Sequence, residues 1–304
     1  MVILWCVRPI LTKVISMQTD KIFHYTSVNS LGLILKSQKI RFSRLDTFDD
    51  ILEAQTHAGI EFGKCFFASC WTQDEVESIP QWDMYGDGST GVRIELPVKP
   101  FRQIKLESVP GFTVSPEMRH SSPLETRELF GKSYFISPTM VYNDDFFQGH
   151  VEYVSDVENR WKEAITFTPD YSGRRTPSLT IKSPHTVVRK KSSDWSFQAE
   201  YRFSLFVMPI FPLYEPVNDS LPTVDQMVTA GDALRRSVDP VATYIDVPLD
   251  PSVLDHLIVW VGPLCTDEER IKVETLVKEL APKAVIKVSA LAGKIRSRKK
   301  VTNE

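Results

Sequence analysis

The strongest constraint on the fold comes from the C-terminal third of this 304-residue chain. Residues 257–262, LIVWVG, are a continuous apolar run typical of a buried strand. Thr266 and Glu269 follow in the T-x-x-E pattern of a capping box, which predicts the start of a helix. The apolar face of that helix is made by Val273, Leu276, Val277 and Leu280. Residues 284–290, AVIKVSA, predict a second strand, so the region predicts a β-α-β unit with a right-handed parallel crossover.

Shorter segments upstream predict further strands and helices. Ser27 is a suitable N-cap for a helix that reaches residue 39, and residues 76–86 predict a second, shorter helix. The expected strands are KIFHYTS (21–27), IRFSRL (40–45), KCFFASCWT (64–72), GVRIELP (91–97) and the later part of DWSFQAEYRFSLFVMPI (194–210). We expect an α+β fold.

The domain boundaries follow from shifts in composition. Residues 17–292 are expected to form a single domain. We expect residues 1–16 to be a dispensable extension and residues 293–304 to be a basic, disordered tail. Two polar, proline-rich stretches, 98–190 and 212–250, are predicted to be insertions into the domain.

The composition is that of a globular protein, with 42% hydrophobic residues and a net charge of −3. This charge gives no overall basic field for a nucleic acid or a membrane. The apolar start of the chain is interrupted by Arg8 and Lys13, which argues against a membrane span and a secretion signal. The 4 cysteines and 6 histidines lack the spacing of a zinc site. We therefore expect reduced thiols, no bound metal and a cytoplasmic location.

Residues 86–91, GDGSTG, match the G-x-G-x-x-G pattern of dinucleotide-binding loops. In such a loop a strand leads into the glycines and a helix leaves them, so that the helix N-terminus faces the pyrophosphate. Here the order is reversed, because the helical IPQWDMY precedes the glycines and the β-branched VRIEL follows them. The sequence therefore predicts a turn at Asp87 and Gly88 and argues against a Rossmann site.

Several motifs in a fixed order carry a resemblance to known proteins. The chain has H-Y-T-S from His24, S-C-W from Ser69, W-x-x-Y-G from Trp82, G-V at residues 91–92 and E-x-R from Glu200. This set resembles a large family of bacterial domains of unassigned function, over residues 21 to about 291. The chain departs from that family at Asp49-Asp50-Ile51, where asparagine and proline are common, whereas Glu53 fits the family pattern.

That family in turn resembles the ADP-ribosyltransferase-like superfamily. This second resemblance implies a split β-sheet core that binds NAD in a cleft without G-x-G-x-x-G and without a metal. Glu200 would be the catalytic carboxylate, His24 would contact the adenosine ribose and Tyr85 would stack on the nicotinamide. Arg44 and Arg202 would meet the pyrophosphate. The full set of NAD-binding residues implied in this way is His24, Tyr25, Thr26, Arg44, Ser69, Trp71, Tyr85 and Arg202.

The implied function is cleavage of the nicotinamide–ribose bond with transfer of ADP-ribose to a macromolecule, either protein or nucleic acid. Such an enzyme would suit a toxin or an anti-phage effector, and a regulatory partner could control it. Two alternatives stay open, namely an NAD glycohydrolase and a non-catalytic domain that binds RNA or protein. The residues also have structural interpretations. Glu200 and Arg202 lie two apart on a strand and share a face, so they could form a structural ion pair.

Overall fold

The structure is a computed structural model that describes most of the chain between residues 20 and 296. The described ranges are 20–54, 56–57, 59–108, 121–137, 144–157, 159, 164–168, 178–181, 184–210, 233–234 and 236–296. The predicted extension at residues 1–16 lies outside the described residues, as does the predicted tail beyond residue 296.

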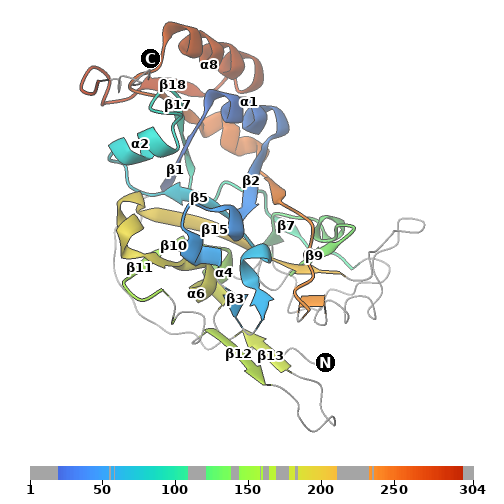
Figure 1. Cartoon of the computed structure of the whole chain (residues 1–304). Coiled ribbons are helices and arrows are strands. Elements are labelled where there is room, and N and C mark those ends of the chain that lie inside the picture. The colour runs from blue at the N-terminus through green and yellow to red at the C-terminus, as the bar shows by residue number, and fades with distance from the viewer. Residues whose placement is uncertain are drawn as a thin grey trace, which may run out of the picture.

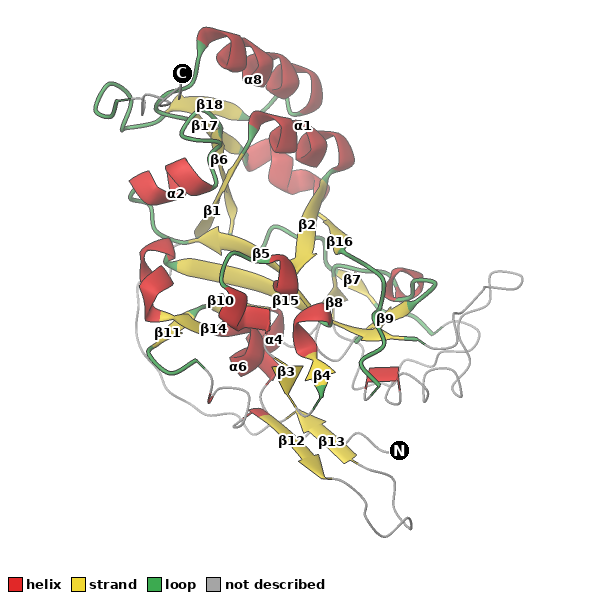
Figure 2. Ribbon diagram, in the orientation of Figure 1, coloured by secondary structure: helices red, strands yellow, loops and turns green. Residues whose placement is uncertain are grey.

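The fold is α+β and is organised by a large mixed sheet of 10 strands, seen across the centre of Figures 1 and 2. Its main path runs β10 (Gln148–His150), β15 (Glu200–Pro209), β5 (Phe66–Thr72), β1 (Lys21–Thr26), β6 (Val92–Pro97), β17 (Ile258–Val261) and β18 (Val285–Val288). Three more strands join beside this path, namely β2 (Lys39–Arg44), β16 (Tyr244–Pro248) and β9 (Tyr134–Ile136). The strands predicted from the sequence are all present.

Smaller elements surround the sheet. Four two-stranded sheets are β11 (Glu152–Val154) with β14 (Lys190–Ser192), β12 (Ile165–Thr168) with β13 (Ser178–Ile181), β3 (Thr56–His57) with β4 (Ile60–Glu61), and β7 (Ile104–Lys105) with β8 (Ser121–Ser122). The helices are α1 (Val28–Ser37), α2 (Ile79–Met84), α4 (Asp144–Phe147), α6 (Pro184–Arg189) and α8 (Asp267–Leu280). Short 3₁₀ helices are η1 (Leu45–Thr47), η2 (Ile51–Ala54), η3 (Phe62–Lys64), η5 (Thr126–Leu129), η6 (Ser193–Gln198) and η7 (Pro251–His256).

The central strands β5 and β15 are buried on both faces, which explains their almost continuous apolar sequences. Neighbouring residues of a strand point to opposite faces of the sheet. Phe67 accordingly belongs to the larger hydrophobic cluster, whereas Phe66 belongs to a second cluster on the other face. Phe203 and Phe206 divide between the two clusters in the same way. A strand covered on both sides loses the alternating pattern of a half-exposed strand.

The C-terminal β-α-β unit is confirmed. Strands β17 and β18 pair in parallel, and α8 connects them along the chain. The Thr266 hydroxyl accepts from the backbone N–H of Glu269 at 3.2 Å, while the Glu269 carboxylate accepts from the backbone N–H of Thr266 at 3.0 Å, so the capping box is formed. Figure 1 shows α8 beside α1, where Gly32 faces Leu276. The two helices together cover one end of the sheet.

The segment GDGSTG forms a turn between α2 and β6, as predicted. Asp87, Gly88 and Ser89 all have a positive φ, of 52°, 62° and 76°. Gly91 has a different reason to be glycine, since a Cβ there would lie 2.3 Å from the carbonyl oxygen of Thr26. The glycines therefore shape a tight connection between helix α2 and strand β6.

The two stretches predicted to be insertions contribute to the main sheet. Within residues 98–190, β9 and β10 both pair with β15. Within residues 212–250, β16 pairs with β2 over five residues, from Tyr244 to Pro248. These three strands therefore belong to the main sheet. Short strands in polar surroundings carry little sequence signal, and their pairing partners are distant in the chain.

Strand β5 changes partner along one of its edges. Near its start, Ala68 and Phe67 pair with Ser43 and Arg44 of β2. At its end, Thr72 pairs with Phe23 of β1. Residues 69–71 lie between these two ladders, and they have no register partner on either strand. The opposite edge is paired continuously with β15. Strands β1 and β2 therefore diverge along this edge of β5.

Candidate functional site

A pocket of about 340 Å³ lies where β1 and β2 diverge along β5. Its wall includes residues 23–25 of β1, residue 43 of β2 and residues 68–71 of β5. The loop before η2, helix α2 and the end of η6 supply further lining residues. Of the residues implied by the resemblance, the structure brings six together in this pocket, namely His24, Tyr25, Ser69, Trp71, Tyr85 and Glu200. The volume falls within the range of about 300–1,000 Å³ found for small-molecule sites.

His24 projects from β1 and is held by the divergent edge of β5. Its Nδ1 lies 2.8 Å from the carbonyl oxygen of Cys70. A carbonyl can only accept a hydrogen bond, so Nδ1 carries the proton and Nε2 is left as an acceptor. Burial lowers the pKa of His24 below its usual value, and the ring is therefore neutral at pH 7. A neutral imidazole with a fixed tautomer can accept from a hydroxyl group, such as that of a ribose.

Ser69 and Trp71 lie two apart on β5 and both line the pocket. The indole Nε1 of Trp71 donates to the Ser69 hydroxyl at 3.0 Å. The Trp71 ring also lies 4.9 Å from the His24 ring, centroid to centroid, with the planes tilted by 37°. This arrangement fixes an aromatic surface at the base of the pocket, and it leaves the hydroxyl hydrogen of Ser69 available as a donor.

Tyr85 ends α2 and joins two other segments of the wall. Its hydroxyl donates to the Asp49 carboxylate at 3.1 Å and accepts from the side-chain amide of Gln198. Gln81 of α2 donates to the backbone carbonyl of Gln198 at 2.6 Å, which holds η6 against the helix. Burial and the nearby Asp49 raise the pKa of Tyr85, so its hydroxyl stays protonated at neutral pH.

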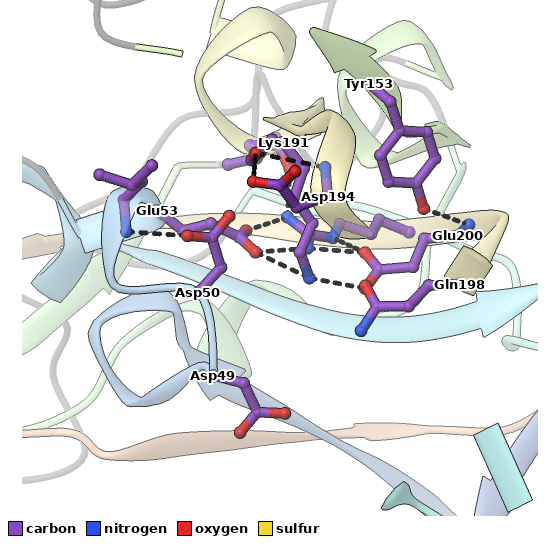
Figure 3. Close-up of polar contacts among 12 residues, drawn as sticks. Asp49, Asp50, Glu53, Tyr153, Lys191, Asp194, Gln198 and Glu200 are labelled. Carbon is purple, nitrogen blue, oxygen red and sulfur yellow. Dashed lines mark hydrogen bonds and ion pairs between the residues drawn. The ribbon is translucent and has the colours of Figure 1, made fainter. Parts of the chain in front are cut away.

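Glu200, at the start of β15, belongs to a buried cluster of four charged side chains. The cluster consists of Glu53, Lys191, Glu200 and Arg202. Figure 3 shows Glu53 and Glu200 on either side of Lys191, joined by dashed contacts. Their exposed fractions are 1%, 2%, 7% and 0% in the order given. The two carboxylates and two cations make the cluster neutral overall, which a buried site requires.

The geometry of the cluster is specific. The Lys191 ammonium lies 3.1 Å from Oε1 of both Glu53 and Glu200. Arg202 contacts both carboxylates as well, and its Nη2 lies 2.6 Å from Oε2 of Glu200 and 3.0 Å from Oε1 of Glu53. Burial alone would raise the pKa of Glu53, but Arg202 and Lys191 hold it below its usual value. Both carboxylates are therefore oriented by the same two cations.

One acceptor position of Glu200 is still available. A carboxylate has about four lone-pair sites. On Oε2 of Glu200, Nε and Nη2 of Arg202 both lie at 2.6 Å. Oε1 receives the single contact from Lys191 at 3.1 Å. Among the contacts formed by the described residues, Oε1 thus keeps room for one further donor, and Glu200 lines the pocket.

Three residues implied by the resemblance are not part of the pocket wall, namely Thr26, Arg44 and Arg202. Arg44 is buried, and its guanidinium contacts Asp46 and Asp239. Arg202 is fully buried beneath Glu200. The pocket wall instead includes Arg41 of β2, whose guanidinium lies 3.5 Å from the centre of the Tyr244 ring. Nε and Nη2 of Arg41 donate to the Asp246 carboxylate at 2.9 and 3.2 Å, so this arginine already has an anionic partner.

Sequence reasoning missed several lining residues, including Phe48, Asp49, Lys191 and Gln198. Gln198 could have been found, because it lies two residues before Glu200 in a segment already singled out. Lys191 carried no such signal. Its position depends on the parallel pairing of β14 with β11, two short strands in a polar stretch without periodicity.

No group of three or more His, Cys, Asp or Glu side chains is arranged to hold a metal ion within the described ranges. Of the helices that the structure describes, none is long and apolar enough to cross a membrane. Comparison with protein-family models, curated proteins and solved structures gives no match to this chain.

Proposed function

We propose that this protein is an ADP-ribosyltransferase-like enzyme that binds NAD in the pocket beside β5 and transfers ADP-ribose to a macromolecule. The observation that carries the proposal is the convergence of His24, Trp71 and Glu200 on one pocket, although they come from three distant parts of the sequence. The divergence of β1 and β2 along β5 supports the split-sheet core that the resemblance implies. No glycine-rich phosphate loop is needed in such a core.

The chemistry follows from the charges in the pocket. The bond between ribose C1′ and the nicotinamide nitrogen breaks, and its electron pair leaves with the nicotinamide. The sugar becomes positively charged, as in glycoside hydrolysis. Oε1 of Glu200 can accept from the ribose 2′-hydroxyl, and the carboxylate charge then stabilises the sugar cation. An acceptor nucleophile attacks C1′ and loses its proton, which completes the transfer.

The remaining side chains have roles in binding. The neutral His24 ring accepts from a ribose hydroxyl through Nε2. Trp71 and Tyr85 offer aromatic faces for the nicotinamide or adenine ring. Arg41 can donate to the pyrophosphate from Nη1, while its Nε and Nη2 stay on the Asp246 carboxylate. Together these groups supply an aromatic surface, a hydroxyl acceptor and an anion contact, which are the three features that a dinucleotide requires.

A non-catalytic binding domain is the second candidate, and one observation favours it. Both oxygens of Glu200 already contact cations, as expected if the carboxylate only balances charge in the core. The open acceptor position on Oε1 supports the enzyme, because it leaves Glu200 able to accept from a ligand in the pocket.

The test is an assay with NAD labelled in its adenylate part, incubated with the full chain and a bacterial cell extract. Label that enters macromolecules supports transfer, whereas free ADP-ribose supports the alternative of NAD hydrolysis. The informative variant is Glu200→Gln, because glutamine keeps the shape and can still accept from Arg202. The matched control is Glu268→Gln on α8, where the carboxylate is exposed and far along the chain from the pocket. Turnover lost in Glu200→Gln but kept in Glu268→Gln supports the proposal. No turnover by the wild type refutes it and favours the binding domain.

A further inference from the structure

The buried charge cluster presents an electrostatic problem for the reaction proposed above. A sugar cation beside Glu200 is attracted by that carboxylate but repelled by Lys191 and Arg202, which contact the same carboxylate. Glu200 with its two cations would carry a net charge of about +1, which is the wrong sign for stabilising a cation. A second anion is needed for Glu200 to be effective.

Glu53 supplies that anion. It comes from η2, and its carboxylate contacts both cations on the side away from Glu200. The side chain is 1% exposed and is not part of the pocket wall, so it has no route to a bound ligand. Arg202 is positioned further by the backbone carbonyl of Val188, which accepts from its Nη1 at 2.8 Å.

We infer that Glu53 is a positioning residue for the reaction, and that it neutralises and orients Lys191 and Arg202 so that the negative charge of Glu200 acts on the sugar cation. This inference rests on the proposed function. Glu53 acts only through the cluster, so it should affect the transition state, in which the positive charge moves from the nicotinamide ring onto the ribose beside Glu200, more than the binding of NAD. Its removal should therefore lower kcat by a larger factor than it changes KM.

The charge of the cluster can be changed in both directions. Glu53→Gln leaves a net charge of about +1, Lys191→Met leaves about −1, and the double variant returns the cluster to neutrality. If charge is what matters, kcat should fall in Glu53→Gln by roughly 10- to 100-fold. It should recover in the double variant, in which the cluster is neutral again. Glu53→Asp keeps the charge, so its kcat should fall less than that of Glu53→Gln.

The measurement is the initial rate of nicotinamide release from NAD by the full chain, since both transfer and hydrolysis release nicotinamide. Thermal unfolding of each variant shows how much of it is folded at the assay temperature. A structural role alone predicts that each variant loses activity in proportion to its loss of stability, so that kcat per folded protein is the same in Glu53→Gln and in the double variant. Such a result, or an unchanged kcat in folded Glu53→Gln, overturns the inference while leaving the proposed function intact. If the wild type releases no nicotinamide, the proposed function fails and this inference fails with it.

Discussion

The stability of the buried charge cluster can be tested without any assumption about function. In Glu53→Gln the side chain keeps its size but loses its charge. It then leaves Lys191 and Arg202 with Glu200 as the single anion of the cluster. Glu53 is 1% exposed and contacts both cations, so water cannot replace the lost charge. Removing one partner of a buried ion pair costs about 3–5 kcal/mol. The glutamine oxygen can still accept from one cation, so we expect the lower end, about 3 kcal/mol.

A double-mutant cycle separates charge from packing. Lys191→Met should be destabilising by a similar amount, about 3 kcal/mol, because it leaves an uncompensated carboxylate. The double variant keeps the neutral Glu200–Arg202 pair and should cost clearly less than the sum of the two single variants. The free energy of unfolding is measured by urea denaturation followed by tryptophan fluorescence. If the loss of unfolding free energy in the double variant equals the sum of the losses in the two single variants, the four charges do not act as one unit.

Two further predictions concern pH and helix capping. The pKa of His24 is lowered by burial in the folded state, so the unfolded chain binds more protons between that value and the ordinary 6.5. The contribution of His24 to the free energy of unfolding should therefore be fully present above about pH 6.5 and should be lost as the pH falls below that value. The variant His24→Asn can keep a donor for the Cys70 carbonyl, and its free energy of unfolding should fall less over the same pH range. Burial also lowers the pKa of His150, so part of the loss of stability at low pH should remain in His24→Asn. If the free energy of unfolding of His24→Asn fell with pH as much as that of the wild type, the role of His24 in this loss would be refuted. Thr266→Ala removes the N-cap of α8 and should cost about 1 kcal/mol in urea denaturation, whereas Thr275→Ala, in the middle of the same helix, should cost less.

Much of the local structure followed from the sequence because local signals were strong. The capping box at Thr266 and Glu269 marks the start of α8 through contacts only three residues apart. The same is true of Ser27, whose hydroxyl accepts from the backbone N–H of Ser30 at 3.0 Å and starts α1. The turn at Asp87 and Gly88 was predictable for the same reason, because a small set of residues accepts a positive φ. These features depend on interactions between residues that lie close together in the sequence.

The candidate site could be predicted in part only. Motifs indicated that His24, Trp71 and Glu200 belong together, but no property of the sequence fixed their distances. The identity of the arginine in the pocket was not predictable either. Arg41 and Arg44 lie on the same strand, and only the course of β2 against β5 and β16 puts one of them in the wall and buries the other. Likewise, only the pairing of β14 with β11 in the folded chain brings Lys191 into the pocket wall.

The sequence by itself determined where α1 and α8 begin and which central strands are buried, since hydrogen bonds at helix ends and apolar runs act over short distances. Only the tertiary structure decided that β1 and β2 separate along β5, and that Glu53 meets Glu200 through two shared cations. The reason is physical. Burying a charge is costly unless partners compensate it, and for this cluster the partners of opposite sign come from segments up to about 150 residues apart.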